Sequence, residues 1–97
     1  MKNITTLSNT LHERKQRYGE FDIHAHITQS LKNTMKKAGS FTTNWESLSC
    51  SQKEALEMIA HKIGRILNGD PNYADSWHDI AGYAQLIVIE LEKNALA

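Results

Sequence analysis

Cysteine and proline are almost absent from this chain of 97 residues, which contains one of each. A single cysteine, Cys50, excludes an intramolecular disulfide and a zinc site built from several thiolates. We interpret Cys50 as a small residue near the start of a helix rather than as a reactive nucleophile. Because Pro71 is the only proline, long helices are permitted and no proline-rich linker divides the chain.

The chain also lacks net charge, since 11 lysine and arginine residues balance 11 aspartate and glutamate residues. Without an excess of positive charge there is no long-range attraction for a polyanion, so we do not expect nucleic acid as a partner. No apolar run approaches the roughly 20 residues that cross a bilayer, and the first residues lack the apolar core of a signal peptide. We therefore predict no membrane partner and a cytoplasmic location.

Alternation of apolar and polar residues is scarce as well, whereas apolar residues recur at helical spacing. We predict an all-α fold, a small bundle of about four helices that forms one domain over residues 1–97. A chain of this length buries only about two-thirds of the surface of its unfolded state. We therefore expect homo-oligomerisation to complete the bundle.

The predicted elements follow the helical periodicity and its interruptions. They are an N-terminal helix with a Tyr-Gly turn over residues 1–21, a helix over 22–39, a connector over 40–48, and two core helices over 49–68 and 74–94. We expect Phe41 and Trp45 to hold the connector against the core.

Capping residues set the expected helix ends. Gly19 and Gly69 follow the first and third helices, where glycine readily takes the conformation that ends a helix. Asp22 has the residue type of an N-cap for the second helix. A capping box opens the third helix, formed by Ser49 with Gln52 or by Ser51 with Glu54.

Acidic residues form two pairs between residues 54 and 83. Asp75 and Asp79 are four residues apart, so both carboxylates project from one helical face and repel each other. Either the positive end of the helix dipole or a divalent cation offsets that repulsion. Glu54 and Glu57 form a second pair on the preceding helix. We predict that these four carboxylates hold Mg²⁺ as a cofactor.

Basic and aromatic residues of the same segment complete a nucleotide site. Lys62, Arg65 and His61 would contact phosphate oxygens, and Trp77 or Tyr83 would stack on a base. A plainer interpretation makes Lys62 and Arg65 a solvated basic edge, paired with acids one turn away, and makes Trp77 part of the core. On spacing alone the plainer interpretation is favoured.

Two runs of the chain resemble a family of small bacteriophage and prophage proteins that is catalogued as a domain of unknown function. They are residues 60–70 and the run Asp75-Ser76-Trp77-His78-Asp79-Ile80-Ala81-Gly82-Tyr83. An earlier motif adds to the resemblance, Glu13-Arg14 followed by Tyr18-Gly19-Glu20-Phe21, so that it covers about residues 13–86. The resemblance implies a phage or prophage origin and expression in the cytoplasm of a bacterial host.

The acidic pairs are also distantly similar to the all-α nucleoside triphosphate pyrophosphatases of the MazG and dUTPase type. Those enzymes hold Mg²⁺ with Glu-x-x-Glu on one helix and Glu-x-x-Asp on the next, and Glu54-Ala55-Leu56-Glu57 fits the first motif. Asp75 and Asp79 have a spacing of four, and Lys53 and Ser76 stand where that family has glutamates. A phage domain associated with nucleotide modification, with Lys-x-x-Arg and a late Asp-x-x-x-Asp, fits better.

These resemblances imply a nucleotide-binding protein of the pyrophosphatase-like helical class. If it is an enzyme, we expect a Mg²⁺-dependent nucleoside triphosphate pyrophosphohydrolase. Two alternatives stay open: non-catalytic sequestration of a host nucleotide signal in anti-defence, and an oligomeric helical adaptor for a protein partner. Binding of a nucleotide is favoured over its hydrolysis.

Overall fold

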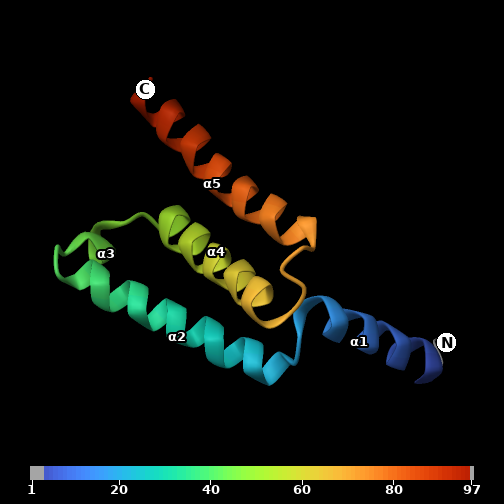
Figure 1. Ribbon diagram of the computed structural model, residues 1–97. Coiled ribbons are helices and arrows are strands. Elements are labelled where there is room, and N and C mark those ends of the chain that lie inside the picture. Colours follow the sequence, from blue (N-terminus) through green and yellow to red (C-terminus); the bar gives the residue numbers. More distant parts are fainter. Residues whose placement is uncertain (1–3, 97) are drawn as a thin grey trace.

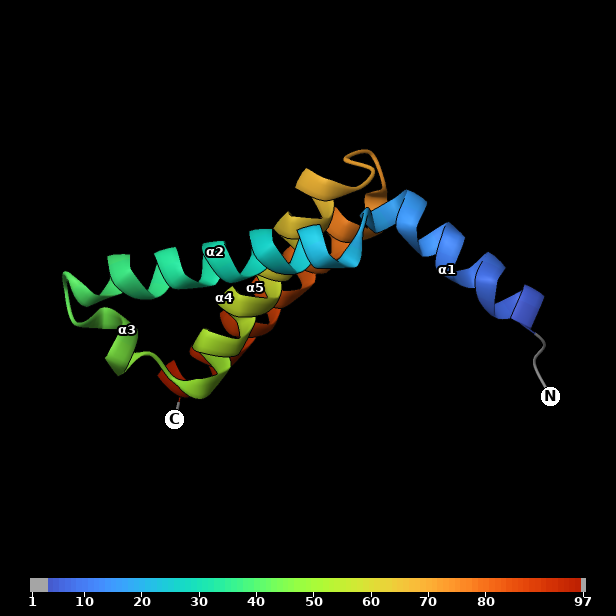
Figure 2. The same ribbon diagram turned by 90° about the horizontal axis from the view of Figure 1, so that it is seen from below.

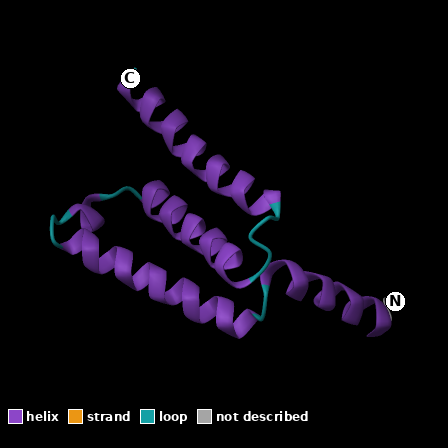
Figure 3. Cartoon of the chain, in the orientation of Figure 1, coloured by secondary structure: helices purple, strands orange, loops and turns teal. Residues whose placement is uncertain are grey.

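The computed structural model describes residues 4–96, and within that range the chain forms five helices and no strand. The helices are α1 (Ile4–Tyr18), α2 (Phe21–Ser40), α3 (Asn44–Ser47), α4 (Cys50–Asn68) and α5 (Ala74–Ala95) (Figure 3). The predicted all-α class is confirmed. The predicted count of four helices was one too low, because the expected connector contains the single turn α3. Residues 1–3 and 97 of the predicted domain lie outside the described residues.

Local signals set the ends of the helices. Gly19 has a φ of 80°, which glycine adopts without a steric penalty, and it separates α1 from α2. Ser49 accepts a hydrogen bond from the backbone N–H of Gln52, whose side chain accepts one from the backbone N–H of Ser49, so the first of the two capping boxes is present. The predicted Asp22 cap was wrong, because the helix begins one residue earlier and Glu20 is the N-cap.

Helices α2, α4 and α5 lie side by side and run in alternating directions, with α4 between the other two (Figure 1). Helix α1 projects away from one end of this layer in both views (Figures 1 and 2). The molecule is therefore elongated, with extents of 52 × 30 × 28 Å. None of the described helices combines the length and apolar composition needed to cross a bilayer.

The close approach of α2 to α4 depends on small residues. Gly64 faces His24 and Thr28, and a Cβ added at Gly64 would lie 2.6 Å from the Thr28 hydroxyl oxygen. His24, Thr28 and Gly64 are all buried. On the other side of α4, Ser76 is buried at the start of α5. The fully buried residues named at both helix contacts are therefore polar or small, where an ordinary core would have large apolar ones.

The turn between α1 and α2 is tied to the end of α4. The side-chain amide of Asn68 donates to the carbonyl of Tyr18 at 3.0 Å and to that of Glu20 at 2.9 Å. The backbone N–H of Asp70 donates to the carbonyl of Arg17 at 2.7 Å. These bonds fix the end of α1 and the start of α2 against the last turn of α4.

The connector between α2 and α4 differs from the prediction in one respect. Trp45 lies half-buried against Gly39, where the two chain segments meet. Phe41 is 89% exposed, so the expectation that it packs on the core was wrong.

We predict that Asn68→Ala lowers the free energy of unfolding by about 1–3 kcal/mol, because the carbonyls of Tyr18 and Glu20 lose a shared donor. Thermal or urea denaturation measures the change. Asn33→Ala is the matched control, since Asn33 is exposed on α2 and an exposed helical Asn→Ala change is neutral or slightly stabilising. Equal stability of the two variants would contradict the role given to Asn68.

Candidate functional site

A cleft of about 470 Å³ opens where the end of α1, the following turn, the start of α2 and the middle of α4 meet. We call it the α1–α2–α4 cleft. It is lined by Leu11, Arg14, Lys15, Tyr18, Gly19, Glu20, Phe21, His24, His61 and Arg65. A volume of this size falls in the range of small-molecule sites in proteins, which is about 300–1,000 Å³.

Tyr18 organises two of the cations that line the cleft. The guanidinium carbon of Arg65 lies 4.0 Å from the centre of the Tyr18 ring, and that of Arg14 lies 5.1 Å from it. Tyr73 meets the ring of Tyr18 edge to face, with 6.1 Å between the ring centres. Such cation–π contacts hold each guanidinium in place without neutralising its charge.

Positive charge predominates in the cleft although the whole chain is neutral. Glu20 is the one acidic residue in the lining, and it forms an ion pair of 2.6 Å with Lys15. Arg14 and Arg65 make no ion pair with any carboxylate among residues 4–96. With neutral histidines the lining therefore carries two uncompensated positive charges.

Two histidines form the inner wall of the cleft. Nε2 of His24 lies 3.3 Å from Nδ1 of His61 and 3.3 Å from the hydroxyl of Thr28. Burial, followed by the charge of His24 and then that of Arg65, lowers the pKa of His61 to about 4. Burial and then Arg65 lower the pKa of His24 as well. Both rings are therefore neutral near pH 7 and serve as hydrogen-bonding groups.

The structure separates Lys62 from the other predicted phosphate ligands. Lys62 is buried between α4 and α5, where its ammonium lies 3.1 Å from a carboxylate oxygen of Asp79. His61 and Arg65, in contrast, both line the cleft. The predicted Lys-x-x-Arg pair is thus divided, with Lys62 holding α5 and Arg65 facing the open space.

The four carboxylates predicted to hold Mg²⁺ have different neighbours. Glu57 lies 3.7 Å from the ammonium of Lys36, and Glu54 is exposed. Asp79 is paired with Lys62, and the described part of the chain contains no group of three or more candidate ligands placed to hold a metal ion. The donor set as arranged here does not fit a bound Mg²⁺ ion.

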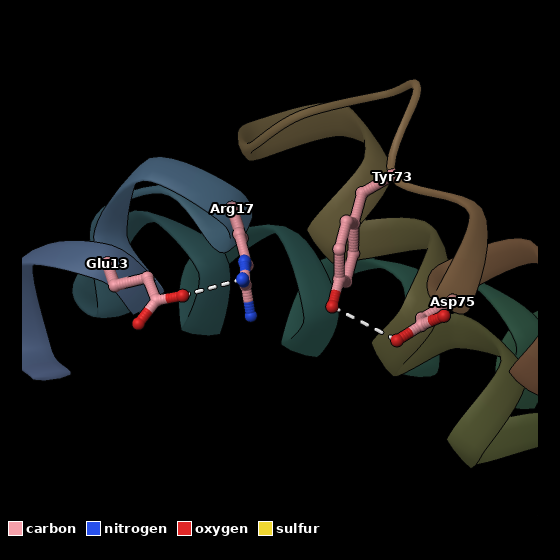
Figure 4. A network of polar contacts seen from close by, with 4 residues as sticks. All are labelled: Glu13, Arg17, Tyr73 and Asp75. Carbon is pink, nitrogen blue, oxygen red and sulfur yellow. Dashed lines mark hydrogen bonds and ion pairs between the residues drawn. The ribbon is translucent and has the colours of Figure 1, made fainter.

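Asp75 belongs to a network that joins α1 to the start of α5 (Figure 4). The hydroxyl of Tyr73 donates to Asp75 at 3.0 Å, and this bond raises the pKa of Tyr73. Arg17 stacks 5.0 Å from the centre of the Tyr73 ring and pairs with Glu13 at 2.6 Å. Asp75 therefore orients an aromatic side chain at the junction of the helices.

The two aromatic residues predicted to stack on a base lie on α5, and neither lines the cleft. Trp77 is 55% exposed and donates its indole N–H to the carbonyl of Pro71 at 2.9 Å. It borders a shallower depression with Pro71, Asn72, Ala74 and His78. Tyr83 is half-buried. The plainer interpretation of Trp77 as a core residue does not describe it either.

Sequence reasoning missed most of the residues that line the cleft on α1 and α2. Arg14, Tyr18 and Phe21 belong to the Glu-Arg and Tyr-Gly-Glu-Phe motif, which the sequence shows plainly but to which no chemistry was assigned. Their connection to Arg65 depends on the turn that Asn68 holds, a contact between residues about 50 positions apart. Helical periodicity carries no information on such a contact.

Residues 4–89 match the family described as a domain of unknown function, DUF6378, and the chain belongs to that family. The expected membership of a family of unknown function is thereby confirmed. No curated protein and no solved structure matches the chain.

Lowering the pH should destabilise the protein through His61. Its pKa is about 4 in the folded chain against 6.5 in the unfolded one, so the unfolded state binds more protons between those values. The stabilising effect of neutral His61 is present above about pH 6.5 and is lost as the pH falls toward 4. We expect the melting temperature to decrease from pH 7 to pH 5, and to decrease less in His61→Gln.

His12→Gln is the control for that measurement, because His12 is exposed on α1. The same pH dependence in the natural chain, His61→Gln and His12→Gln would show that the buried pair does not control it.

Proposed function

We propose that this protein binds a nucleotide in the α1–α2–α4 cleft and does so without a metal ion. The observation that carries the proposal is the pair of arginines, Arg14 and Arg65, which flank one tyrosine ring with no carboxylate partner among the described residues. A phosphate-bearing ligand supplies the negative charge that the cleft lacks.

The arginines have the chemistry that phosphate groups require. A guanidinium presents two parallel N–H donors to phosphate oxygens, and such charge-assisted bonds are among the strongest in proteins. Stacking on Tyr18 restricts both side chains before the ligand arrives, so less conformational entropy is lost on binding. Lys15 adds a third cation, which Glu20 holds at the edge of the cleft.

The rest of the lining suits the base and sugar of a nucleotide. Phe21 lines the cleft and is 79% exposed, so its ring is accessible to a ligand. Stacking of a base on an aromatic ring contributes about 1–3 kcal/mol. Nδ1 of His61 and Nε2 of His24 contact each other, which leaves Nε2 of His61 for a polar ligand atom.

Hydrolysis is the less well-supported activity. A mechanism of the pyrophosphatase type needs carboxylates that converge on a metal ion. Here Glu57, Asp75 and Asp79 each have a different partner, and Glu54 is exposed. Binding without turnover agrees with sequestration of a nucleotide signal. The proposal also includes a phage or prophage origin and a role in anti-defence. Both rest on the resemblance of the sequence motifs alone.

Calorimetric titration with nucleoside mono-, di- and triphosphates, in buffer that contains EDTA, tests the proposal. We expect binding of at least one nucleotide and chemically intact ligand after recovery. Arg14→Gln and Arg65→Gln should each weaken binding by about 10- to 100-fold, the loss of one hydrogen bond to a charged group. Arg17→Gln is the matched control, because Arg17 leaves the cleft to stack on Tyr73.

Three outcomes would contradict the proposal. Absence of heat or thermal shift with every nucleotide would favour the adaptor hypothesis, in which the charged residues serve a protein partner. Equal weakening by Arg17→Gln and Arg65→Gln would place the ligand elsewhere. Binding that requires Mg²⁺ and is lost in Asp75→Asn and Asp79→Asn would support the metal-dependent hypothesis.

A further inference from the structure

Large apolar side chains are exposed to an unusual degree in this chain. Ala55 and Ala60 are the hydrophobic residues that are buried among the described side chains, and both are small. The accessible surface is 7243 Å², about 1,600 Å² more than a compact monomer of 11.0 kDa has. The radius of gyration is 16.6 Å, against about 12.5 Å for a compact domain of 97 residues.

Part of that surface comes from the projecting α1, and another part is a stripe along α5. The stripe consists of Trp77, Ala81, Ala84, Val88, Leu91 and Ala95, which are all exposed. Their spacing alternates strictly between four and three residues, which is the spacing of a straight seam between two packed helices. We call these residues the α5 seam.

The α5 seam is separate from the surface by which α5 contacts α4. The residues turned toward α4 are Ser76, Ile80, Tyr83 and Ile87, which are buried or half-buried. At about 100° per residue the seam lies roughly a quarter turn from them. Nothing in the described part of the chain covers it.

Helix α4 extends the apolar surface on the same side of the layer. Its apolar residues Leu56, Ile63 and Leu67 lie a quarter turn from the contact with α5, and the antiparallel direction of the two helices places their stripe beside the α5 seam. Arg65 is roughly half a turn from Leu56 and Leu67. The apolar surface and the α1–α2–α4 cleft therefore occupy opposite faces.

The α5 seam is complementary to itself when a second copy runs antiparallel. In that arrangement Trp77 lies opposite the partner's Ala95, Ala81 opposite the partner's Leu91, and Ala84 opposite the partner's Val88. Each large side chain meets a small one, as close packing between helices requires. In a parallel pair, Trp77 of one chain would instead lie opposite Trp77 of the other. Ala81 and Ala84 would each face their own equivalents and leave gaps.

We propose that two copies of this chain form a two-fold symmetric dimer through antiparallel contact of their α5 seams. A two-fold interface uses the same patch on both subunits, which the large-to-small pairing of the seam permits. The excess surface of about 1,600 Å² per chain also includes α1, and it exceeds the roughly 800 Å² per partner that a standard protein–protein interface buries. Both clefts stay open on the outer faces.

Light scattering coupled to gel filtration, over a range of concentrations, tests the dimer. We expect twice the mass of one chain for the natural protein. Val88→Glu places a charge in the seam and should abolish the dimer, with a monomer or an unfolded chain as the product. Leu86→Glu is the matched control: Leu86 is 60% exposed but lies nearly half a turn from Val88, so the dimer should persist.

A helical monomer for the natural chain, or equal loss of the dimer in Val88→Glu and Leu86→Glu, overturns the proposal. Cross-linking tests the direction of the helices without relying on a disruptive variant. In a Cys50→Ser background, single Ala84→Cys and Val88→Cys proteins are oxidised alone and as a mixture. The antiparallel seam predicts a mixed disulfide dimer and little product from either protein alone. Efficient cross-linking of each protein with itself contradicts it.

Discussion

Asn68 ties the turn between α1 and α2 to the end of α4, and the candidate site depends on that tie. Helix α1 has few other points of attachment, since most of it projects from the layer of helices. The two bonds from one amide bring Tyr18 under the guanidinium of Arg65. Gly19 permits the turn because its φ of 80° is costly for other residues. One polar side chain thus connects the Tyr-Gly motif to the chemistry of α4.

The layer of helices has two faces with different physical character. One face carries the α1–α2–α4 cleft, with an exposed phenylalanine ring and two arginines that have no carboxylate partner among residues 4–96. The other carries the apolar residues of α4 and the α5 seam. Between these two faces, the ion pair of Lys62 with Asp79 joins α4 to α5. Because the two charges are paired with each other, they are unavailable to a ligand. A nucleotide on one face would neutralise the positive charge that a single chain leaves exposed. A second copy on the other face would cover the exposed apolar surface.

The sequence predicted helix positions well and helix contacts poorly. Ser49, Gln52 and Gly19 act within one turn of the backbone, so their effect is visible in the local sequence. Gly69 follows α4 as predicted, but its φ of −113° lies outside the left-handed region, and its missing side chain instead lets Arg17 and Tyr18 approach. Periodicity alone does not show which residues of α4 are buried, because α2 and α5 contact it on nearly opposite sides, whereas a helical wheel assumes one core face. His61 packs against α2, and the apolar Leu67 is exposed. Of the predicted ligands, Arg65 and His61 reach the cleft.

The claim that a nucleotide occupies the α1–α2–α4 cleft is tested most directly by nuclear magnetic resonance of isotopically labelled protein. Nucleotide is added in the presence of EDTA while side-chain signals are followed. The account predicts that the signals of the Arg14 and Arg65 guanidinium groups and of the His61 ring change together and saturate. The account would be contradicted if the signals of Trp77 and Tyr83 changed while those of Arg14, Arg65 and His61 stayed the same.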